Sequence, residues 1–297
     1  MAIRNSNFEL LRLILMVMII IHHCIAHGLA LAGLDPEFHY SMDLPEKWTG
    51  GFMLINCLCI CAVNCFVLIS GYFGIHTNKK KVFYLVFALI FYTIIFNVFP
   101  NIVLGKYFKA IKYSLFLSHS NYWFVIDYLF LMVFAPMINM AFDKMSKCYI
   151  NIFIIGLIVI SVYFGFVWGH AANKNGYTLL QFILMYCIGR FIAQRKYSLQ
   201  QSKSIALYLV CSLICGFLMW GLWSAGYPLL SWRMTYYNNP FIILSSIGLF
   251  LCFKDYTFVS KRINTIAQSA FGIYLFQSSA FIGRTMYTDC LLYTSDA

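Results

Sequence analysis

Long apolar segments, separated by short polar ones, constrain this chain more than any other feature of its sequence. Most of them approach the roughly 20 residues that an α-helix needs to cross a bilayer. In order, the segments comprise residues 7–30, 50–73, 82–104, 121–142, 149–169, 177–194, 204–225, 239–254 and 265–284. With 62% hydrophobic and 10% charged residues, the chain lies outside the composition of soluble globular domains. We therefore expect an all-α, polytopic protein embedded in a lipid bilayer.

The positions of Lys and Arg predict how the chain is oriented in its membrane. A cytoplasmic N-terminus puts 13 basic residues in cytoplasmic segments and seven outside, in agreement with the positive-inside rule. Lys106, Lys109 and Lys112 fall on the outer side, where their spacing predicts an amphipathic helix lying on the membrane. The net charge of +11 is dispersed between apolar runs, so we expect no nucleic-acid partner. The 11 cysteines match no metal-binding spacing, so we expect no metal.

Ionisable side chains interrupt the first apolar segment. At about 100° per residue, Glu9, Arg12 and His23 share one stripe of a helix, with Arg12 and His23 roughly 16 Å apart along its axis. His27 continues the stripe, whereas His22 points about 100° away from it. Because ionisable groups inside a membrane helix are costly, this stripe is a candidate functional site.

Each of these residues also has a purely structural interpretation. Glu9 could complete a capping box with Ser6, or it could pair with Arg12 one helical turn later. The Arg12 side chain could extend to the cytoplasmic headgroups, and His23 could be a satisfied core residue. A histidine on the same face as a buried arginine is less easily explained in that way, which favours a catalytic role for His23.

Several other polar residues lie at membrane depth. A buried carboxylate such as Asp127 must be paired or protonated, and it could orient an imidazole or bond a neighbouring helix. Asn64, Ser70 and Gln277 are typical of hydrogen bonds between membrane helices. Arg233 could contact an acceptor sugar or lie at the rim of the protein.

The order of motifs along the chain resembles the membrane-bound acyltransferase family 3, the group of bacterial polysaccharide O-acetyltransferases. Its most specific part is an arginine followed eleven residues later by a histidine, matched here by Arg12 and His23. Further matching strings occur at residues 63–73, 122–124 with 135–139, and 271–275. They follow one another in the family's order, and the resemblance covers most of the chain.

The resemblance implies a single integral-membrane acyltransferase domain over residues 1–297, with about nine of some ten family helices present. It implies that acetyl-CoA is the cytoplasmic donor and that the acceptor is a hydroxyl of a surface or exported polysaccharide or lipid-linked glycan. It also implies a location in the bacterial cytoplasmic membrane, with His23 as the catalytic histidine and Arg12 as its partner. Our candidate catalytic residues are therefore His23, Arg12, Glu9 and Asp127, and Arg12 is also our candidate for binding the acetyl-CoA donor.

The chemistry of these side chains agrees with that implication. Acyl transfer to a hydroxyl benefits from a base that removes the proton, and a neutral imidazole suits that role near pH 7. A guanidinium can bind a phosphate or thioester oxygen, or stabilise developing negative charge. Given their separation, we expect Arg12 near the donor entrance and His23 near the reacting groups.

Two features depart from the family pattern. The late motif commonly ends in His, where this chain has Gln277. Residues 285–297 neither complete another span nor form a polar tail, so we expect the C-terminal end to be truncated or atypical. The alternative function is a transporter or flippase that moves lipid-linked sugars without acyl-transfer chemistry. Such proteins often carry inverted repeats and paired Gly or Pro interruptions, and the sequence has neither.

Overall fold

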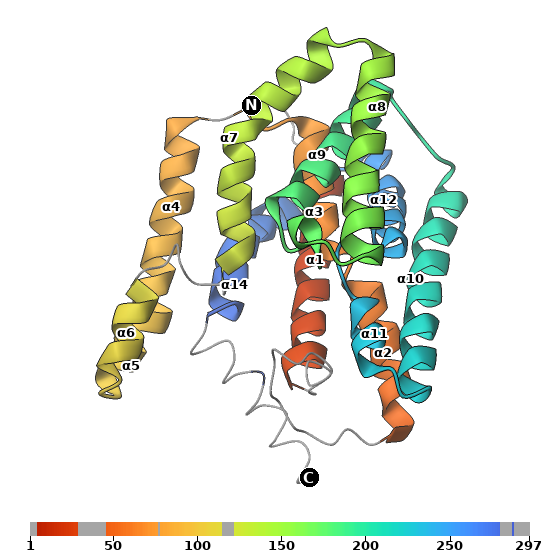
Figure 1. Ribbon diagram of the computed structural model, residues 1–297. Coiled ribbons are helices and arrows are strands. Elements are labelled where there is room, and N and C mark those ends of the chain that lie inside the picture. Colours follow the sequence, from red (N-terminus) through yellow and green to blue (C-terminus); the bar gives the residue numbers. More distant parts are fainter. Residues whose placement is uncertain (1–4, 29–45, 77, 115–121, 280–286, 288–297) are drawn as a thin grey trace.

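Helices packed side by side make up the computed structural model, of which we describe residues 5–28, 46–76, 78–114, 122–279 and 287 (Figure 1). Within that part of the chain there are helices and no β-strand. Six of the helices described are long and apolar enough to cross a membrane, namely Asn7–Ala26, Thr49–Phe73, Lys79–Val103, Trp123–Lys144, Lys147–Val167 and Gln201–Ser224. Two shorter apolar helices are Leu179–Gln194 and Pro240–Lys254. The predicted all-α, multi-pass membrane architecture is confirmed.

The predicted segments correspond to the observed helices in order. The elements are α1 (Asn7–His23), η1 (Cys24–Gly28), α2 (Glu46–Cys59), α3 (Ala62–Phe73), α4 (Lys79–Thr93), η3 (Ile94–Val98), α5 (Phe99–Val103), α6 (Tyr107–Ser114), α7 (Trp123–Lys144), α8 (Lys147–Ile158), η6 (Val159–Val167), η7 (Ala171–Asn173), α9 (Leu179–Gln194), α10 (Gln201–Ser224), α11 (Pro228–Arg233), α12 (Pro240–Lys254), α13 (Lys261–Ile266), η8 (Ala267–Ser269) and α14 (Ala270–Gln277). The predicted segment 265–284 corresponds to the run from α13 to α14. The expectation for residues 285–297 lies outside the described residues, apart from Tyr287.

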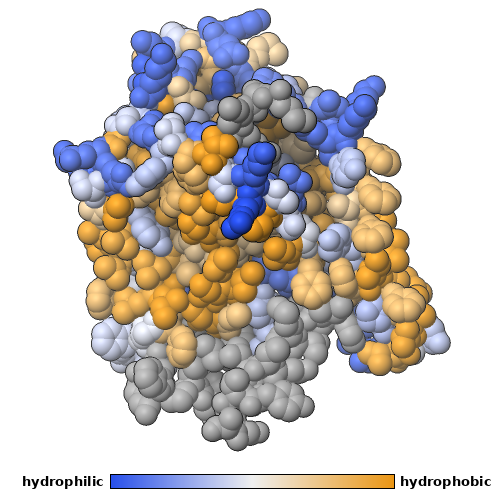
Figure 2. Space-filling model, turned by 180° about the vertical axis from the view of Figure 1, so that it is seen from behind, coloured by the Kyte–Doolittle hydropathy of each residue, from blue (hydrophilic) through white to orange (hydrophobic). Residues whose placement is uncertain are grey.

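The helices divide into an inner group and a lipid-facing group. Figure 1 shows α1 and α3 near the centre, with α4 and α10 towards the two sides. In the span Thr49–Phe73 72% of the most apolar window is buried in the protein, against 17% in the span Lys79–Val103. Figure 2 shows apolar side chains in a broad band on one face of the molecule, with hydrophilic side chains gathered at one end of it. The outer helices therefore present their apolar surface to lipid.

Two glycines allow α3 and α9 to pack backbone against backbone. A Cβ atom on Gly71 would overlap the carbonyl oxygen of Tyr186, and one on Gly189 would overlap the carbonyl oxygen of Leu68. Small residues permit such close approach in membrane proteins, where van der Waals packing drives helix association. This contact fixes α3, and with it one wall of the cavity described below.

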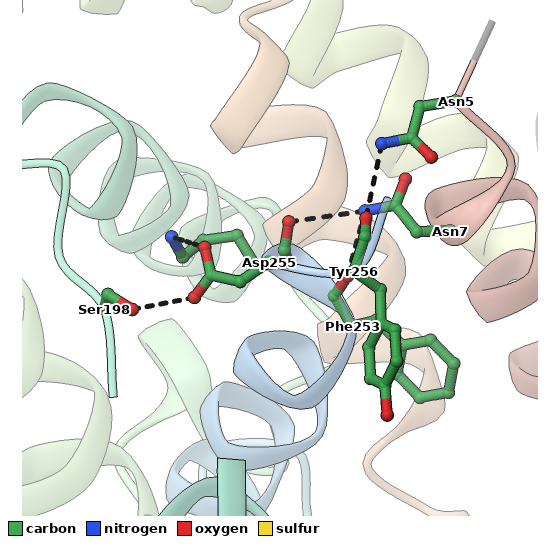
Figure 3. A network of polar contacts seen from close by, with 7 residues as sticks. Asn5, Asn7, Ser198, Phe253, Asp255 and Tyr256 are labelled. Carbon is green, nitrogen blue, oxygen red and sulfur yellow. Dashed lines mark hydrogen bonds and ion pairs between the residues drawn. The ribbon is translucent and has the colours of Figure 1, made fainter. Parts of the chain in front are cut away.

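The start of α1 is tied to the far end of the chain, as Figure 3 shows. The Asn7 side-chain amide donates to the carbonyl oxygens of Phe253 at 2.9 Å and Lys254 at 3.3 Å. The Asn5 amide donates to the carbonyl oxygen of Tyr256 at 3.2 Å. These bonds join the start of α1 to backbone carbonyls at and just beyond the end of α12, so α1 and α12 are held at a fixed relative height.

Ser6 takes part in the same tether instead of capping α1. Its hydroxyl accepts a hydrogen bond from the backbone N–H of Ser260 at 2.8 Å and makes no cap bond to its own helix. The capping-box interpretation of Glu9 is therefore wrong. The amphipathic helix predicted around Lys109 and Lys112 is present as α6, and both lysines are exposed.

Candidate functional site

A cavity of about 720 Å³ lies beside α1 and reaches both of its candidate residues. Arg12 lines one end and His23 the other, roughly 16 Å apart along the helix axis. Other walls come from α2, α3, α4, α7, α11, the run from η8 to α14, and the segments that precede α9 and α12. The shared helical stripe that the sequence indicated for Arg12 and His23 therefore faces a single cavity.

At the first end of the cavity, Arg12 is held by a carboxylate from its own helix. Its guanidinium forms a salt bridge with Glu9, three residues earlier, and the Glu9 side chain is 6% exposed against 29% for Arg12. Glu9 itself does not line the cavity. Pairing offsets part of the cost of bringing a cation out of water, so Glu9 stabilises the Arg12 guanidinium beside the cavity. Nearby, the hydroxyls of Ser70 and Tyr128 lie 3.1 Å apart.

At the second end, His22 joins His23 in lining the cavity. The Nδ1 atom of His22 lies 2.6 Å from the side-chain oxygen of Asn56 in α2. An amide oxygen only accepts, so Nδ1 carries the proton, and Nε2 of the neutral ring is left as an acceptor. Helical spacing placed His22 about 100° away from the stripe, and sequence analysis considered only residues on that one face of α1. The two adjacent histidines in the sequence, His22 and His23, were the feature that could have identified His22 as a candidate.

His23 occupies the last turn of α1, immediately before the backbone changes to the π-helix η1. Its ring is half-buried, and the ring of Tyr287 meets it edge to face at a centroid distance of 5.9 Å. Irregular turns of this kind are frequent at functional sites. The position of the His27 side chain, the remaining member of the predicted stripe, lies outside the described part of the structure.

Asp127 stands apart from the other candidates. It lies in α7 and is half-buried, but it is absent from the residues that line the cavity. The structure thus places Arg12 and His23 on one cavity, with Glu9 bonded to Arg12, and leaves Asp127 outside that cavity. Arg233 also lies outside the lining, because its guanidinium bonds the backbone carbonyl oxygens of Phe166 and Val167.

Gln277, which stands where the late motif commonly has His, does face the cavity. It is the last residue of α14 and is buried. Its side-chain oxygen accepts a hydrogen bond from the Tyr287 hydroxyl at 2.6 Å, and its side-chain nitrogen lies 3.6 Å from the sulfur of Met16. Gln277 therefore positions the same tyrosine whose ring meets His23.

Three aromatic residues form a cluster that sequence analysis did not identify. The rings of Trp123, Tyr177 and Tyr237 all line the cavity. Their centroids are 4.6 Å apart for Trp123 and Tyr177, 4.7 Å for Tyr177 and Tyr237, and 5.6 Å for Trp123 and Tyr237. We call these three residues the aromatic cluster. They come from distant parts of the chain, so no local pattern could have joined them.

A buried network of amides and hydroxyls lies behind the aromatic cluster. The side-chain oxygen of Gln181 accepts a hydrogen bond from the Ser161 hydroxyl at 2.7 Å. The side-chain nitrogen of Gln181 donates to the carbonyl oxygen of Tyr237 at 2.9 Å, and that of Asn64 donates to the same oxygen at 2.8 Å. Buried polar groups need such partners, and this network fixes the backbone that carries Tyr237. A glutamine inside the apolar helix α9 was the signal for it.

The arrangement combines chemically distinct groups in one membrane-embedded space. A paired guanidinium can bind an anionic or thioester oxygen at one end. Two imidazoles, one with its tautomer set by Asn56, can accept a proton at the other end.

Comparison with known proteins gives one match. A model of the acyltransferase domain family matches residues 5–291, which is nearly the whole chain. The comparisons with curated proteins and with solved structures found no match.

Proposed function

The chain belongs to the acyltransferase domain family, and from that membership we propose that it transfers an acetyl group from acetyl-CoA to a hydroxyl of a surface or exported polysaccharide. The observation that carries the proposal is the cavity that reaches both Arg12 and His23. A transferase whose two substrates approach from opposite sides of a membrane needs such a shared space. Transport without chemistry is the weaker alternative, because family membership favours an acyltransferase.

Arg12 is the group that binds the donor in this mechanism. Acetyl-CoA is anionic, and its thioester lies at the end of a long pantetheine arm. The guanidinium offers paired N–H donors that suit phosphate or carbonyl oxygens. Glu9 keeps the guanidinium in place, and the cavity leads from there towards the histidines. We assign Arg12 to donor binding and Glu9 to its support.

His23 is the base in the same mechanism. Its neutral imidazole accepts the proton of the acceptor hydroxyl while that oxygen attacks the thioester carbonyl carbon. An ester C–O bond forms and the C–S bond breaks. The imidazolium then returns the proton to the departing CoA thiolate, so that the histidine is unchanged after one turnover. We leave Asp127 without a role in this step, because it does not line the cavity.

The orientation that we propose places the start of α1 in the cytoplasm of a bacterium, with the protein in its inner membrane. Figure 1 shows α4 beginning and α7 ending on the side of the molecule where α1 begins. Lys79, Lys80 and Lys81 open α4, and Lys144 and Lys147 flank the connection from α7 to α8. Basic residues on one side mark that side as cytoplasmic. Arg12 then lies on the donor side, and His23 lies closer to the acceptor side.

The test is transfer of labelled acetyl groups from acetyl-CoA to glycan by membranes that contain the protein. We expect label in the glycan with the wild-type chain and a loss of about 10²-fold or more with His23→Ala, because general base catalysis contributes about that much. His76→Ala is the matched control, since His76 is exposed and outside the cavity. Retained transfer in a folded His23→Ala protein would refute the role of His23, and absence of transfer by the wild-type chain would refute the function.

A further inference from the structure

We infer that Lys81 binds the ribose 3′-phosphate of the donor just outside the Arg12 end of the cavity, so that the cavity itself holds only the pantetheine arm. The inference rests on the proposed function, because it assumes that acetyl-CoA is the donor. It goes beyond that function by assigning a residue to the nucleotide part of the donor. The length of the cavity along α1, the face of α4 that carries Lys81, and the charges around it support the inference.

The separation of Arg12 and His23 matches the length of the pantetheine arm. About 13 bonds join the thioester sulfur of acetyl-CoA to its first phosphorus, and an extended chain gains roughly 3.3–3.6 Å for every three bonds. The arm therefore spans about 15 Å, close to the roughly 16 Å between Arg12 and His23 along the helix axis. With the thioester beside His23, the pyrophosphate lies beside Arg12. The 3′-phosphate then lies beyond Arg12, outside the cavity.

Lys81 lies on the face of α4 that leads into the cavity. Leu85 lines the cavity, and Lys81 precedes it by one helical turn at an azimuth only about 40° away. In Figure 1, α4 begins on the side of the molecule where α1 begins. Lys81 therefore lies roughly 6 Å closer to that side than Leu85 does.

A shared buried cluster joins this part of α4 to the Arg12 part of α1. Met16, one turn after Arg12, and Leu89, one turn after Leu85, both belong to it. Because the two helices begin on the same side, Arg12 and Leu85 both lie on that side of the cluster, and both line the cavity. Lys81 is the next residue outward on the same face of α4, which places it at the mouth of the Arg12 end.

The charges around this mouth favour an anion. Arg12 is the only Lys, Arg, Asp or Glu among the described residues that line the cavity. Lys81 is exposed, and within the described part of the chain no acidic residue forms an ion pair with it. The first turn of α4 contains no acidic residue, and the N-terminal end of a helix carries a partial positive charge. A phosphate bound here would therefore gain a charge-assisted hydrogen bond from the Lys81 ammonium.

The neighbouring lysine provides a matched control. Lys80 is also exposed, but it points about 100° away from Lys81. It shares its face of α4 with Tyr84 and Phe87, which are 76% and 55% exposed and outside the cavity lining. Lys80→Gln and Lys81→Gln therefore remove the same charge from adjacent positions, and only Lys81→Gln removes it from the face that leads into the cavity.

The first experiment measures equilibrium binding of CoA and of 3′-dephospho-CoA to the purified full-length chain in lipid nanodiscs. The wild-type chain and Lys80→Gln should bind CoA about tenfold more tightly than dephospho-CoA, because one charge-assisted hydrogen bond contributes about that much. Lys81→Gln should bind both compounds with the affinity that the wild-type chain has for dephospho-CoA. A wild-type chain without this preference, or a Lys81→Gln variant that keeps it, would overturn the inference.

The second experiment measures acetyl transfer by the same variants. Lys81→Gln should raise the KM for acetyl-CoA about tenfold and leave kcat within about twofold, because the 3′-phosphate lies far from the reacting thioester. Lys80→Gln should change neither constant by more than about twofold. An unchanged KM in Lys81→Gln, or a KM that rises equally in both variants, would show that Lys81 does not bind the donor.

The two proposals fail in different ways. If glycan is acetylated but Lys81→Gln behaves like Lys80→Gln, the role of Lys81 is wrong and the proposed function stands. If CoA binding depends on Lys81 and on the 3′-phosphate but no acetyl group reaches glycan, the proposed function is wrong and the phosphate site stands.

Discussion

Two parts of the cavity wall are built in different ways. At the Arg12 end, the functional charge and its partner Glu9 lie on one helix, three residues apart. The aromatic cluster, in contrast, is assembled from the start of α7 and the segments before α9 and α12. The comparison teaches that a single charge in a membrane can be stabilised locally, whereas a surface with a defined shape needs several distant segments. Changes at Arg12 should therefore affect mainly activity, and changes around the aromatic cluster should also affect stability.

The largest expected effect is at the Arg12 end. Arg12→Ala should lower the rate of acetyl transfer at limiting acetyl-CoA about 10–10²-fold, because the anionic donor loses its charged hydrogen-bond partner. Glu9→Gln should cost much less, because its amide oxygen still accepts from the guanidinium. The rates are compared in membranes with equal amounts of folded protein. Similar rates for Arg12→Ala and the wild-type chain would show that the cavity end at Arg12 takes no part in transfer.

The next effect concerns the amide network behind the aromatic cluster. Gln181→Leu should lower the free energy of unfolding by about 1–3 kcal/mol, because it leaves several buried polar groups unpaired. Gln194→Leu, near the other end of α9, removes a bond to the carbonyl oxygen of Phe142 and should cost less. Thermal unfolding in detergent measures both. If the two variants unfold at the same temperature, the network stabilises the protein no more than an ordinary hydrogen bond would.

A smaller effect is expected where α2 supports His22. Asn56→Leu and His22→Gln should each slow transfer moderately, and the double variant should be little worse than either, because both remove the same hydrogen bond. The coupling energy from this double-mutant cycle should be about 1 kcal/mol. Additive effects of the two substitutions would show that the bond between Asn56 and His22 does not matter for the reaction.

The smallest effect is expected at Asp255, on the surface near the start of α1. Its carboxylate accepts hydrogen bonds from Lys254 at 2.6 Å and Ser198 at 2.7 Å. The bond from the Lys254 ammonium, more than the one from Ser198, lowers the pKa of Asp255. A lowered pKa means that this stabilisation is present above the ordinary pKa of about 3.9 and is lost as the pH falls through the folded-state value. Because the side chain is 53% exposed, solvent screening keeps the effect well below about 1 kcal/mol.

The free energy of unfolding, measured for Asp255→Asn and for the wild-type chain at pH 7 and pH 3, tests the sign of this pKa shift. We expect a difference of a few tenths of a kcal/mol at most at pH 7 and a smaller one at pH 3. A larger difference at pH 3 would contradict the sign of the pKa shift. It would also show that the tether between α1 and α12 depends on this charge, whereas we attribute it to the amides of Asn5 and Asn7.

Much of the architecture was predictable because hydrophobic length is a local property. The apolar segments matched the observed helices within a few residues at most ends, and the salt bridge between Glu9 and Arg12 followed from helical spacing. The placement of Arg12 and His23 on one face was predictable for the same reason. The role of Ser6 was predicted wrongly, because its hydroxyl bonds a residue more than 250 positions away rather than its own helix.

The sequence by itself determined that this chain crosses a membrane several times and that its first helix carries a cation and an imidazole on a common stripe. Those features depend on residue type and on the 3.6-residue period of the helix. Only the tertiary structure decided that His22 also faces the cavity, that Asp127 does not, and that Trp123, Tyr177 and Tyr237 meet. The physical reason is that these relations depend on how separate helices and their connecting segments pack, and that packing is set by contacts between residues far apart in the chain.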